Sequence, residues 1–169
     1  QRVHKVPAHS EAPRTVLRSL IETRGYNCEI ASYVAVLDGA TADASLLLMG
    51  CLNYLDPREE RMRTPLSHIQ KRLSRKGLLF RYERGQDEIA VTEGAFGICS
   101  FWAIENLAKR GDWQEAQRSF EHVLGYANDV GLFAEEIDPD SGAQLGNFPQ
   151  AYTHVGLINA ALALERERA

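Results

Sequence analysis

Two adjacent glutamates, Glu135 and Glu136, stand between the apolar residues Phe133 and Ile137. In an extended segment successive side chains point to opposite sides, so one carboxylate can face a pocket while the other faces solvent. Hydrolysis of a glycosidic bond requires two carboxyl groups, one acting as acid and one as base. A solvated acidic loop accounts for the same residues equally well, and the residues alone leave both interpretations open.

Arg81 and two residues of a second loop are candidates for binding a sugar. Arg81 follows an apolar run, and its guanidinium offers a fork of donors that suits sugar hydroxyls, although a surface salt bridge is the simpler alternative. Glu93 and Phe96 stand at the entry of a strongly apolar segment. Phe96 could stack on a sugar face or pack in the core. Thr92 followed by Glu93 could simply cap the helix that follows, whose N-terminus favours a negative charge.

No set of residues predicts a metal or a cofactor. Asp138, Asp140 and Ser141 form an acidic turn, but the EF-hand pattern with its terminal glutamate is absent. The histidines are spread along the chain, and no P-loop, dinucleotide-binding, GxSxG or HExxH motif occurs. We therefore expect no metal and no cofactor.

Composition excludes several classes of protein. The chain has 169 residues, 44% of them hydrophobic, and a net charge of -4, which is ordinary for a globular domain. It has no apolar run of the roughly 18 residues that a membrane helix needs, and its basic residues are scattered among carboxylates, so we expect no membrane and no nucleic-acid partner. Cys28, Cys51 and Cys99 have no CxxC spacing and indicate small buried residues of a reducing compartment, which makes the cytoplasm the expected location.

Helical patterns dominate the elements that must position these loops. Gly25, Gly77 and Gly111 are expected to end helices, Thr41 or Asp43 to cap one, and Thr64-Pro65 to begin another. A helix over 94–109 is apolar around much of its circumference, which predicts burial on two sides. The others are expected over 14–24, 41–55, from 64 to Gly77, from 112 through 124, and from Pro149 through Leu162.

The order of these elements favours a helical toroid. Long helices alternate with short turns and long loops, as they do in a toroid or a superhelical repeat array, and the chain has no fixed repeat period. Beside the helices we expect a short extended run over 78–82 and a turn over 138–142. The last helix is expected to run through Val155, Ile158 and Leu162. The residues expected inside are Val16, Leu17, Leu20, Ile21, Leu46, Leu47, Leu48, Leu52, Leu66, Ile69, Leu73, Ala116, Phe120, Val123 and Leu124.

Longer stretches of the sequence resemble one enzyme family. The run EGAFGICSFWAIENLAKRG and the motifs AEEIDP and GNFPQAYTH are similar to the C-terminal end of bacterial family 15 glycoside hydrolases, which include glucoamylases, glucodextranases and trehalases. The resemblance implies an all-α (α/α)6 barrel, a six-hairpin toroid, of which residues 1–169 supply about the C-terminal half. The runs DASLLLM, YLDP and LLFRY, over 43–49, 54–57 and 78–82, follow the family's order.

The resemblance also implies a reaction and a set of site residues. The family hydrolyses α-glucosidic bonds with inversion, in which an acid protonates the leaving oxygen while a base activates water on the opposite face. By position in the motif Glu135 matches the general base, and Glu136 is the neighbour that could be confused with it. Arg81 matches an arginine that binds glucosyl hydroxyls, and Phe96 stands where eukaryotic members have a tryptophan. The expected substrate-binding residues are Arg81, Glu93, Phe96 and His154.

One part of the family pattern is missing. The general acid belongs to a Trp-Glu segment upstream, whereas Trp102 and Trp113 are followed by other residues. The chain alone is therefore expected to be inactive. Because half a toroid leaves apolar helix faces uncovered, its edge helices are expected to present an unusually apolar surface unless another chain covers it. Its expected partners are an α-glucoside or oligosaccharide substrate and the remainder of the catalytic domain, with a homo-oligomer as a further possibility. Asp43 is expected to cap its helix without a catalytic role.

Two other functions stay open. One is a non-catalytic helical scaffold or carbohydrate-binding module that lacks the general acid. The other is a helical repeat that mediates protein contacts. Arg81, Phe96 and Glu135 favour the enzyme, because a scaffold needs none of these side chains in its loops. The choice between trehalose and a malto-oligosaccharide as substrate also stays open.

Overall fold

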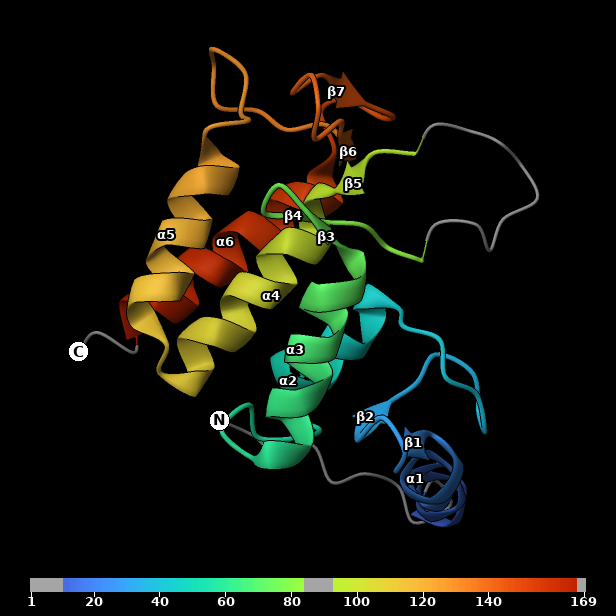
Figure 1. Ribbon diagram of the computed structural model, residues 1–169. Helices are drawn as coiled ribbons and strands as arrows, with labels where there is room; N and C mark the ends of the chain where they lie inside the picture. The colour runs from blue at the N-terminus through green and yellow to red at the C-terminus, as the bar shows by residue number, and fades with distance from the viewer. Residues whose placement is uncertain (1–10, 84–92, 167–169) are drawn as a thin grey trace.

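The structure, a computed structural model, describes residues 11–83 and 93–166. As predicted, it is mainly helical, and its strands form only short antiparallel ribbons (Figure 1). The helices are α1 (Glu11–Arg24), the 3-10 helix η2 (Ala44–Leu47), α2 (Leu48–Cys51), α3 (Glu60–Leu73), α4 (Gly97–Arg110), α5 (Trp113–Leu124) and α6 (Ala151–Arg166). The paired strands are β1 (Tyr26–Asn27) with β2 (Ser32–Tyr33), β3 (Ser74–Arg75) with β4 (Leu78–Leu79), and β6 (Glu136–Ile137) between β5 (Ala95–Phe96) and β7 (Gln144–Leu145).

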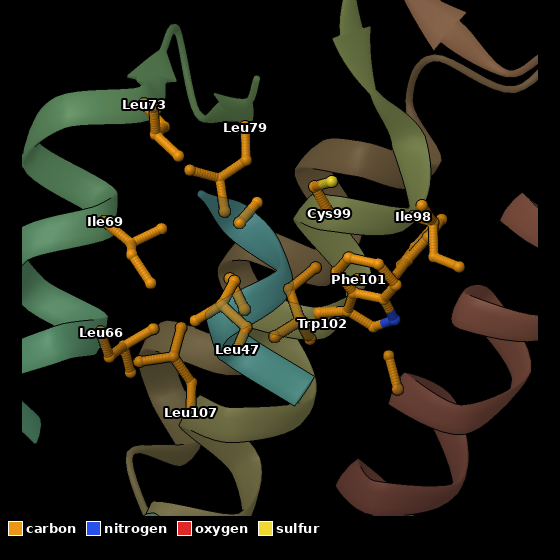
Figure 2. Packing of buried hydrophobic residues seen from close by; sticks show 14 of the residues in the cluster. Leu47, Leu66, Ile69, Leu73, Leu79, Ile98, Cys99, Phe101, Trp102 and Leu107 are labelled. Atoms are coloured by element: carbon orange, nitrogen blue, oxygen red, sulfur yellow. The ribbon is translucent and has the colours of Figure 1, made fainter. Parts of the chain in front are cut away.

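Helix α4 is the centre of the core. Every residue from Gly97 to Ala108 is buried, which confirms the predicted burial on two sides. Figure 2 shows Leu47 of η2 and Leu66 of α3 on one side of α4, and α6 passes on the other. The contact with α6 is close, because a Cβ at Gly156 would lie 3.0 Å from the Ile98 side chain. The N-terminal end of α4 is therefore held firmly between two layers.

The predicted helix over 41–55 is wrong in its extent. Asp43 does act as the cap, since its carboxylate accepts a hydrogen bond from the Ser45 amide at 2.7 Å, but it caps η2. Helix α2 then lasts a single turn. Asn53 adopts a left-handed φ of 58°, and the Tyr54 amide bonds back to the Met49 carbonyl at 2.8 Å. This local closure ends the helix before the apolar periodicity does.

Three other predicted helix ends are misplaced. Helix α3 begins at Glu60, so Pro65 lies inside it with its ring buried in the core, where packing offsets the lost backbone donor. Gly77 ends no helix; it forms the β3–β4 turn together with Lys76, and both have positive φ. Helix α6 begins at Ala151 rather than at Pro149. Gly111, with a φ of 93°, ends α4 as predicted.

Several predicted core residues are exposed. Val16 and Leu17 of α1 are 59% and 60% exposed, and Leu52 and Leu124 also lie at the surface. In α6 the apolar stripe, defined here as Tyr152, Val155, Ile158 and Leu162, is 40–56% exposed, which agrees with the apolar surface expected along the edge helices. Another side of α6 packs on α4, and of the stripe the Tyr152 ring makes an edge contact with Trp102 of α4. An exposed apolar face of this kind is typical of an interaction surface.

The helices in the described ranges give no transmembrane candidate, since each is too short or too polar to cross a bilayer.

Candidate active site

The loops that carry the candidate residues meet at one end of the helices. Strands β5 and β6 pair with Ala95 opposite Ile137 and Phe96 opposite Glu136. Strand β5 leads directly into α4, and β4, which precedes Arg81, contacts both β5 and α4. Figure 1 shows the strands β3 to β7 grouped at this end. The structure therefore gathers the segments of Arg81, Glu93 and Glu135 as predicted.

Glu135 is held by Asn147 on the neighbouring loop. One carboxylate oxygen, Oε2, accepts hydrogen bonds from the Asn147 side-chain amide at 2.9 Å and from the Asn147 backbone amide at 3.3 Å. The Glu135 carbonyl accepts from the Gly97 amide at the start of α4, at 3.1 Å. Among the described residues, the second carboxylate oxygen, Oε1, has no hydrogen-bond partner. Glu135 is half-buried, so this oxygen is available to water or to a ligand.

Glu136 has a different environment. Its Oε2 accepts a hydrogen bond from the Gly94 amide at 2.8 Å. Burial raises the pKa of the Glu136 carboxyl above its ordinary value, the negative charges of Glu93 and Glu135 raise it further, and the Gly94 amide lowers it. The two adjacent glutamates are thus bound by different partners, as the alternation of an extended segment predicts.

The raised pKa of Glu136 predicts a gain of stability on substitution. Between the ordinary and the raised pKa the folded chain binds more protons than the unfolded chain, so the free energy of unfolding falls as pH rises through this window. Glu136→Gln removes this loss of stability, and the side-chain oxygen of the glutamine can still accept a hydrogen bond from the Gly94 amide. We expect the variant to be more stable than the wild type at neutral pH, with a smaller difference below the ordinary pKa. Urea unfolding at pH 4 and pH 7 measures this.

The control for this comparison is Glu115→Gln, because Glu115 is an exposed glutamate in the first turn of α5. This variant should show no gain at neutral pH. An equal gain at both positions would assign the effect to the net charge of the chain rather than to the burial of Glu136.

Arg81 forms a salt bridge with Asp43, the N-cap residue of η2. Its Nε donates to the Asp43 carboxylate at 2.7 Å, and its guanidinium carbon lies 5.2 Å from the ring centre of Tyr82. The predicted alternative of a salt bridge is therefore present. It is not a fully exposed one, since the two side chains are 29% and 13% exposed. Cys99, in the first turn of α4, lies within electrostatic reach of the pair. Arg81 is thus fixed beside the N-terminal end of α4.

Glu93 and Phe96 occupy the approach to α4. Glu93 is exposed, and it is close enough to Glu136 for its charge to act there. Phe96 is half-buried, packs against the hydrophobic core and is the residue before the first turn of α4. Because α4 begins at Gly97, Glu93 lies outside its first turn and does not cap it. Thr92, the other residue considered for this cap, lies outside the described residues.

Both ring nitrogens of His154 form hydrogen bonds with backbone groups. Its Nδ1 lies 2.7 Å from the Gln150 carbonyl, and its Nε2 lies 3.3 Å from the Phe133 amide. Nε2 must accept from that amide, so Nδ1 carries the proton and donates to Gln150. The ring also makes an edge contact with Phe133, with ring centres 6.0 Å apart. His154 therefore supports the chain two residues before Glu135.

Two residues that hold the Glu135 loop were not predicted from the sequence. Asn147 binds the Glu135 carboxylate, and Gln144 accepts from the Ala134 amide at 2.6 Å while donating to the carbonyls of Tyr126 and Leu132. Both stand in or beside the GNFPQ motif. A polar residue near a candidate catalytic loop was the only available indication, because the sequence does not reveal which backbone groups need partners.

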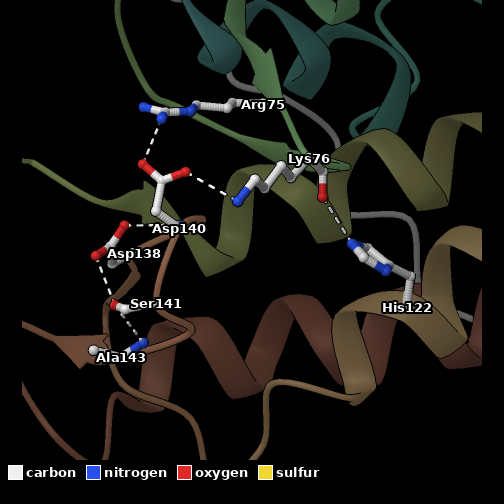
Figure 3. Close-up of polar contacts among 7 residues, drawn as sticks. All are labelled: Arg75, Lys76, His122, Asp138, Asp140, Ser141 and Ala143. Carbon is white, nitrogen blue, oxygen red and sulfur yellow. Dashed lines mark hydrogen bonds and ion pairs between the residues drawn. The ribbon is translucent and has the colours of Figure 1, made fainter.

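The acidic turn after β6 is anchored to the β3–β4 turn. Figure 3 shows Asp140 between Arg75 and Lys76, and the Lys76 ammonium is 3.0 Å from its carboxylate. The Lys76 carbonyl lies 2.8 Å from Nε2 of His122 on α5. Asp138 accepts two hydrogen bonds from within its own turn. In the part of the chain that the structure describes, no three His, Cys, Asp or Glu residues gather as metal ligands do.

Comparison with known proteins finds one family. Residues 110–162 match the family described as "Glycosyl hydrolases family 15". The trehalase of Mycobacterium tuberculosis is 43% identical over 126 residues, which cover 73% of this chain and 18% of that protein. The trehalase of Thermoplasma volcanium is 38% identical over 142 residues, which cover 84% of this chain and 23% of that protein. The chain thus spans about a fifth of the length of these relatives.

A solved structure has the same fold. A glycosidase variant in complex with glucose superposes with a TM-score of 0.78 at 19% identity, over 95% of this chain and 46% of that chain. The match supports the predicted partial (α/α)6 toroid, since nearly all of this chain corresponds to less than half of the larger fold.

Proposed function

Because the chain belongs to glycosyl hydrolase family 15, we propose that it is a working part of an enzyme that hydrolyses an α-glucosidic bond with inversion. Glu135 is the proposed general base, and Arg81 with Phe96 is proposed to bind the glucosyl unit. The general acid would come from outside this chain, roughly 6.5–9.5 Å from the base, as an inverting mechanism requires.

This proposal rests on the way the two oxygens of the Glu135 carboxylate are hydrogen-bonded. Its Oε2 is bound by Asn147, while Oε1 has no hydrogen-bond partner among the described residues. A general base needs an oriented carboxylate with one oxygen able to accept a proton from water. Glu136 is the alternative base; one of its oxygens accepts from the Gly94 amide, and Glu135 is preferred because it holds the place of the base in the family motif.

Trehalose is the substrate we favour over a malto-oligosaccharide. The curated relatives at 38–43% identity are named trehalase, and the similar solved structure is described as a complex with glucose. Glu93, exposed beside the Glu136 loop, and His154, beneath the Glu135 loop, complete the proposed wall of the site. His154 would act there mainly through the backbone that it supports.

We further propose that the apolar stripe of α6 packs against the rest of the toroid. This chain corresponds to 46% of the similar glycosidase, so more than half of that fold has no counterpart in it. Tyr152, Val155, Ile158 and Leu162 are the apolar side chains that such a partner would cover. A homo-oligomer would use the same stripe, and light scattering of the isolated chain would reveal one.

The cytoplasm remains the proposed location. Cys28, Cys51 and Cys99 are all unpaired, which suits a reducing compartment. The prediction that all three are buried is wrong, since Cys28 is exposed on the β1–β2 turn and Cys51 is half-buried.

A hybrid enzyme tests the proposed reaction. In the trehalase hybrid, this chain replaces the matching segment of the Mycobacterium tuberculosis trehalase, with the Thermoplasma volcanium trehalase as a second host. We expect the hybrid to release glucose from trehalose, whereas the host lacking the segment should not. A hybrid that binds the sugar without cleaving it would instead support the non-catalytic carbohydrate-binding module.

The stereochemistry of the product tests the mechanism. Inversion converts an α-glucoside into β-glucose, because water attacks opposite the departing bond. Trehalose should therefore give one β- and one α-glucose, the latter being the leaving group, and 4-nitrophenyl α-glucoside should give β-glucose alone. Proton NMR in the first minutes, before mutarotation, measures both. Only α-glucose from the nitrophenyl substrate would mean a retaining mechanism.

A further inference from the structure

We propose that Asn147 is a positioning residue that directs Oε1 of Glu135 toward the attacking water. This inference rests on the proposed role of Glu135 as general base. It assigns to the side chain of Asn147 the task of fixing one carboxylate oxygen so that the other is presented in a single orientation.

Three hydrogen bonds join Asn147 to Glu135. Asn147 donates twice to Oε2 of Glu135, from its side chain at 2.9 Å and from its backbone at 3.3 Å, and its carbonyl accepts from the Glu135 amide at 2.9 Å. The Asn147 residue therefore binds both the main chain and the carboxylate of one glutamate. With Oε2 doubly bound, the carboxylate cannot turn without breaking hydrogen bonds.

An irregular turn brings Asn147 to this place. Strands β6 and β7 pair with Glu136 opposite Leu145, so regular pairing would place Gly146 opposite Glu135. Gly146 instead has a φ of 73°, and the Glu135 amide bonds to the next residue, Asn147, as in a β-bulge. A Cβ at Gly146 would lie 2.9 Å from Oε2 of Glu135. The turn is thus shaped closely around this carboxylate.

The contacts of Asn147 differ from those of its neighbours. The side chains of Gln144 and His154 bind only main-chain groups, which belong to residues 126–134 and to Gln150, and the Gln150 amide binds the Phe133 carbonyl at 2.9 Å. Those residues hold the path of the loop. Of these loop-supporting residues, Asn147 is the one whose side chain binds the Glu135 carboxylate. Its removal should therefore disturb the carboxylate more than the loop.

The test uses Asn147→Leu in the trehalase hybrid, with Asn147→Ser as a second, smaller variant in case the first does not fold. Misplaced catalytic groups lower turnover by up to about 100-fold, and we expect a loss of about 10- to 100-fold in kcat with little change in KM.

A double-variant cycle separates positioning from a general effect on structure. If Asn147 acts through Glu135, Asn147→Leu should cost almost nothing more in a Glu135→Gln background. The inference is overturned if Glu135→Gln abolishes activity while Asn147→Leu leaves kcat unchanged, or if its loss is the same in both backgrounds. Full activity in Glu135→Gln would instead overturn the proposed function on which the inference rests.

Discussion

Replacing Glu135 by glutamine in the trehalase hybrid should lower kcat by about 100- to 10,000-fold, the usual range for general acid–base catalysis. The substitution keeps the shape of the side chain and an oxygen that can accept from Asn147 at the 2.9 Å contact, but it removes the ability to take a proton from water. Substrate binding should change little, so KM should stay within a few-fold of the wild type. Initial rates of glucose release over a range of trehalose concentrations measure both constants.

Two variants serve as comparisons for this prediction. Glu136→Gln should cost much less, since the Glu136 carboxylate is bound to the Gly94 amide and Glu135 holds the place of the base in the family motif. Arg81→Ala should mainly raise KM, because it removes hydroxyl contacts and leaves the water-activating group in place. Equal losses at Glu135 and Glu136 would leave the base unassigned, and a dominant loss at Glu136 would transfer the role to it.

The fold was predictable wherever local patterns and burial agree. Helix α4 is apolar around much of its circumference, and it is buried from Gly97 to Ala108. Gly111 ends α4 with the positive φ that glycine accommodates best. The meeting of the candidate loops at one end also follows from the alternation of helices with loops.

Prediction failed where a local closure or an absent neighbour decides the structure. The apolar periodicity of 41–55 continues beyond Cys51, but the left-handed Asn53 ends α2 after one turn. In α1 the apolar face has helical spacing, but Val16 and Leu17 are 59% and 60% exposed and no residue of the helix is buried. Periodicity reports which face a helix would bury, and it says nothing about whether the partner belongs to the same segment.

The site was predictable as a set of loops but not as a set of contacts. Phe96 and Glu136 lie opposite each other on the paired strands β5 and β6, and Glu135 directly precedes β6. The Arg81–Asp43 pair joins residues 38 positions apart. Asn147 reaches Glu135 only because Gly146 shifts the register of the β-ribbon. Such contacts depend on the tertiary path of the chain, which residue spacing does not encode.

Phe133→Ala should lower the free energy of unfolding of the chain by about 3–5 kcal/mol, the usual cost of truncating a buried phenylalanine. Phe133 is 0% exposed, and its ring makes edge contacts with Phe101 at 5.8 Å and with His154 at 6.0 Å between ring centres. Its removal leaves a cavity between α4 and the loop that leads to Glu135. Urea unfolding followed by the fluorescence of the buried Trp102 measures the loss.

The matched control is Phe148→Ala, which removes the same atoms from a ring that is 52% exposed and should change stability by about 0.5 kcal/mol or less. Phe133→Leu should fall between the two, because leucine refills part of the cavity. In the hybrid, Phe133→Ala should also reduce kcat at temperatures where the enzyme remains folded, since the Phe133 backbone is tied to His154 and Gln150 two residues before Glu135. A similar loss of stability at Phe133 and Phe148 would contradict the packing described for this loop. A large loss at Phe133 with unchanged kcat would show that the Glu135 carboxylate is positioned by Asn147 and the β-ribbon without help from the core beneath it.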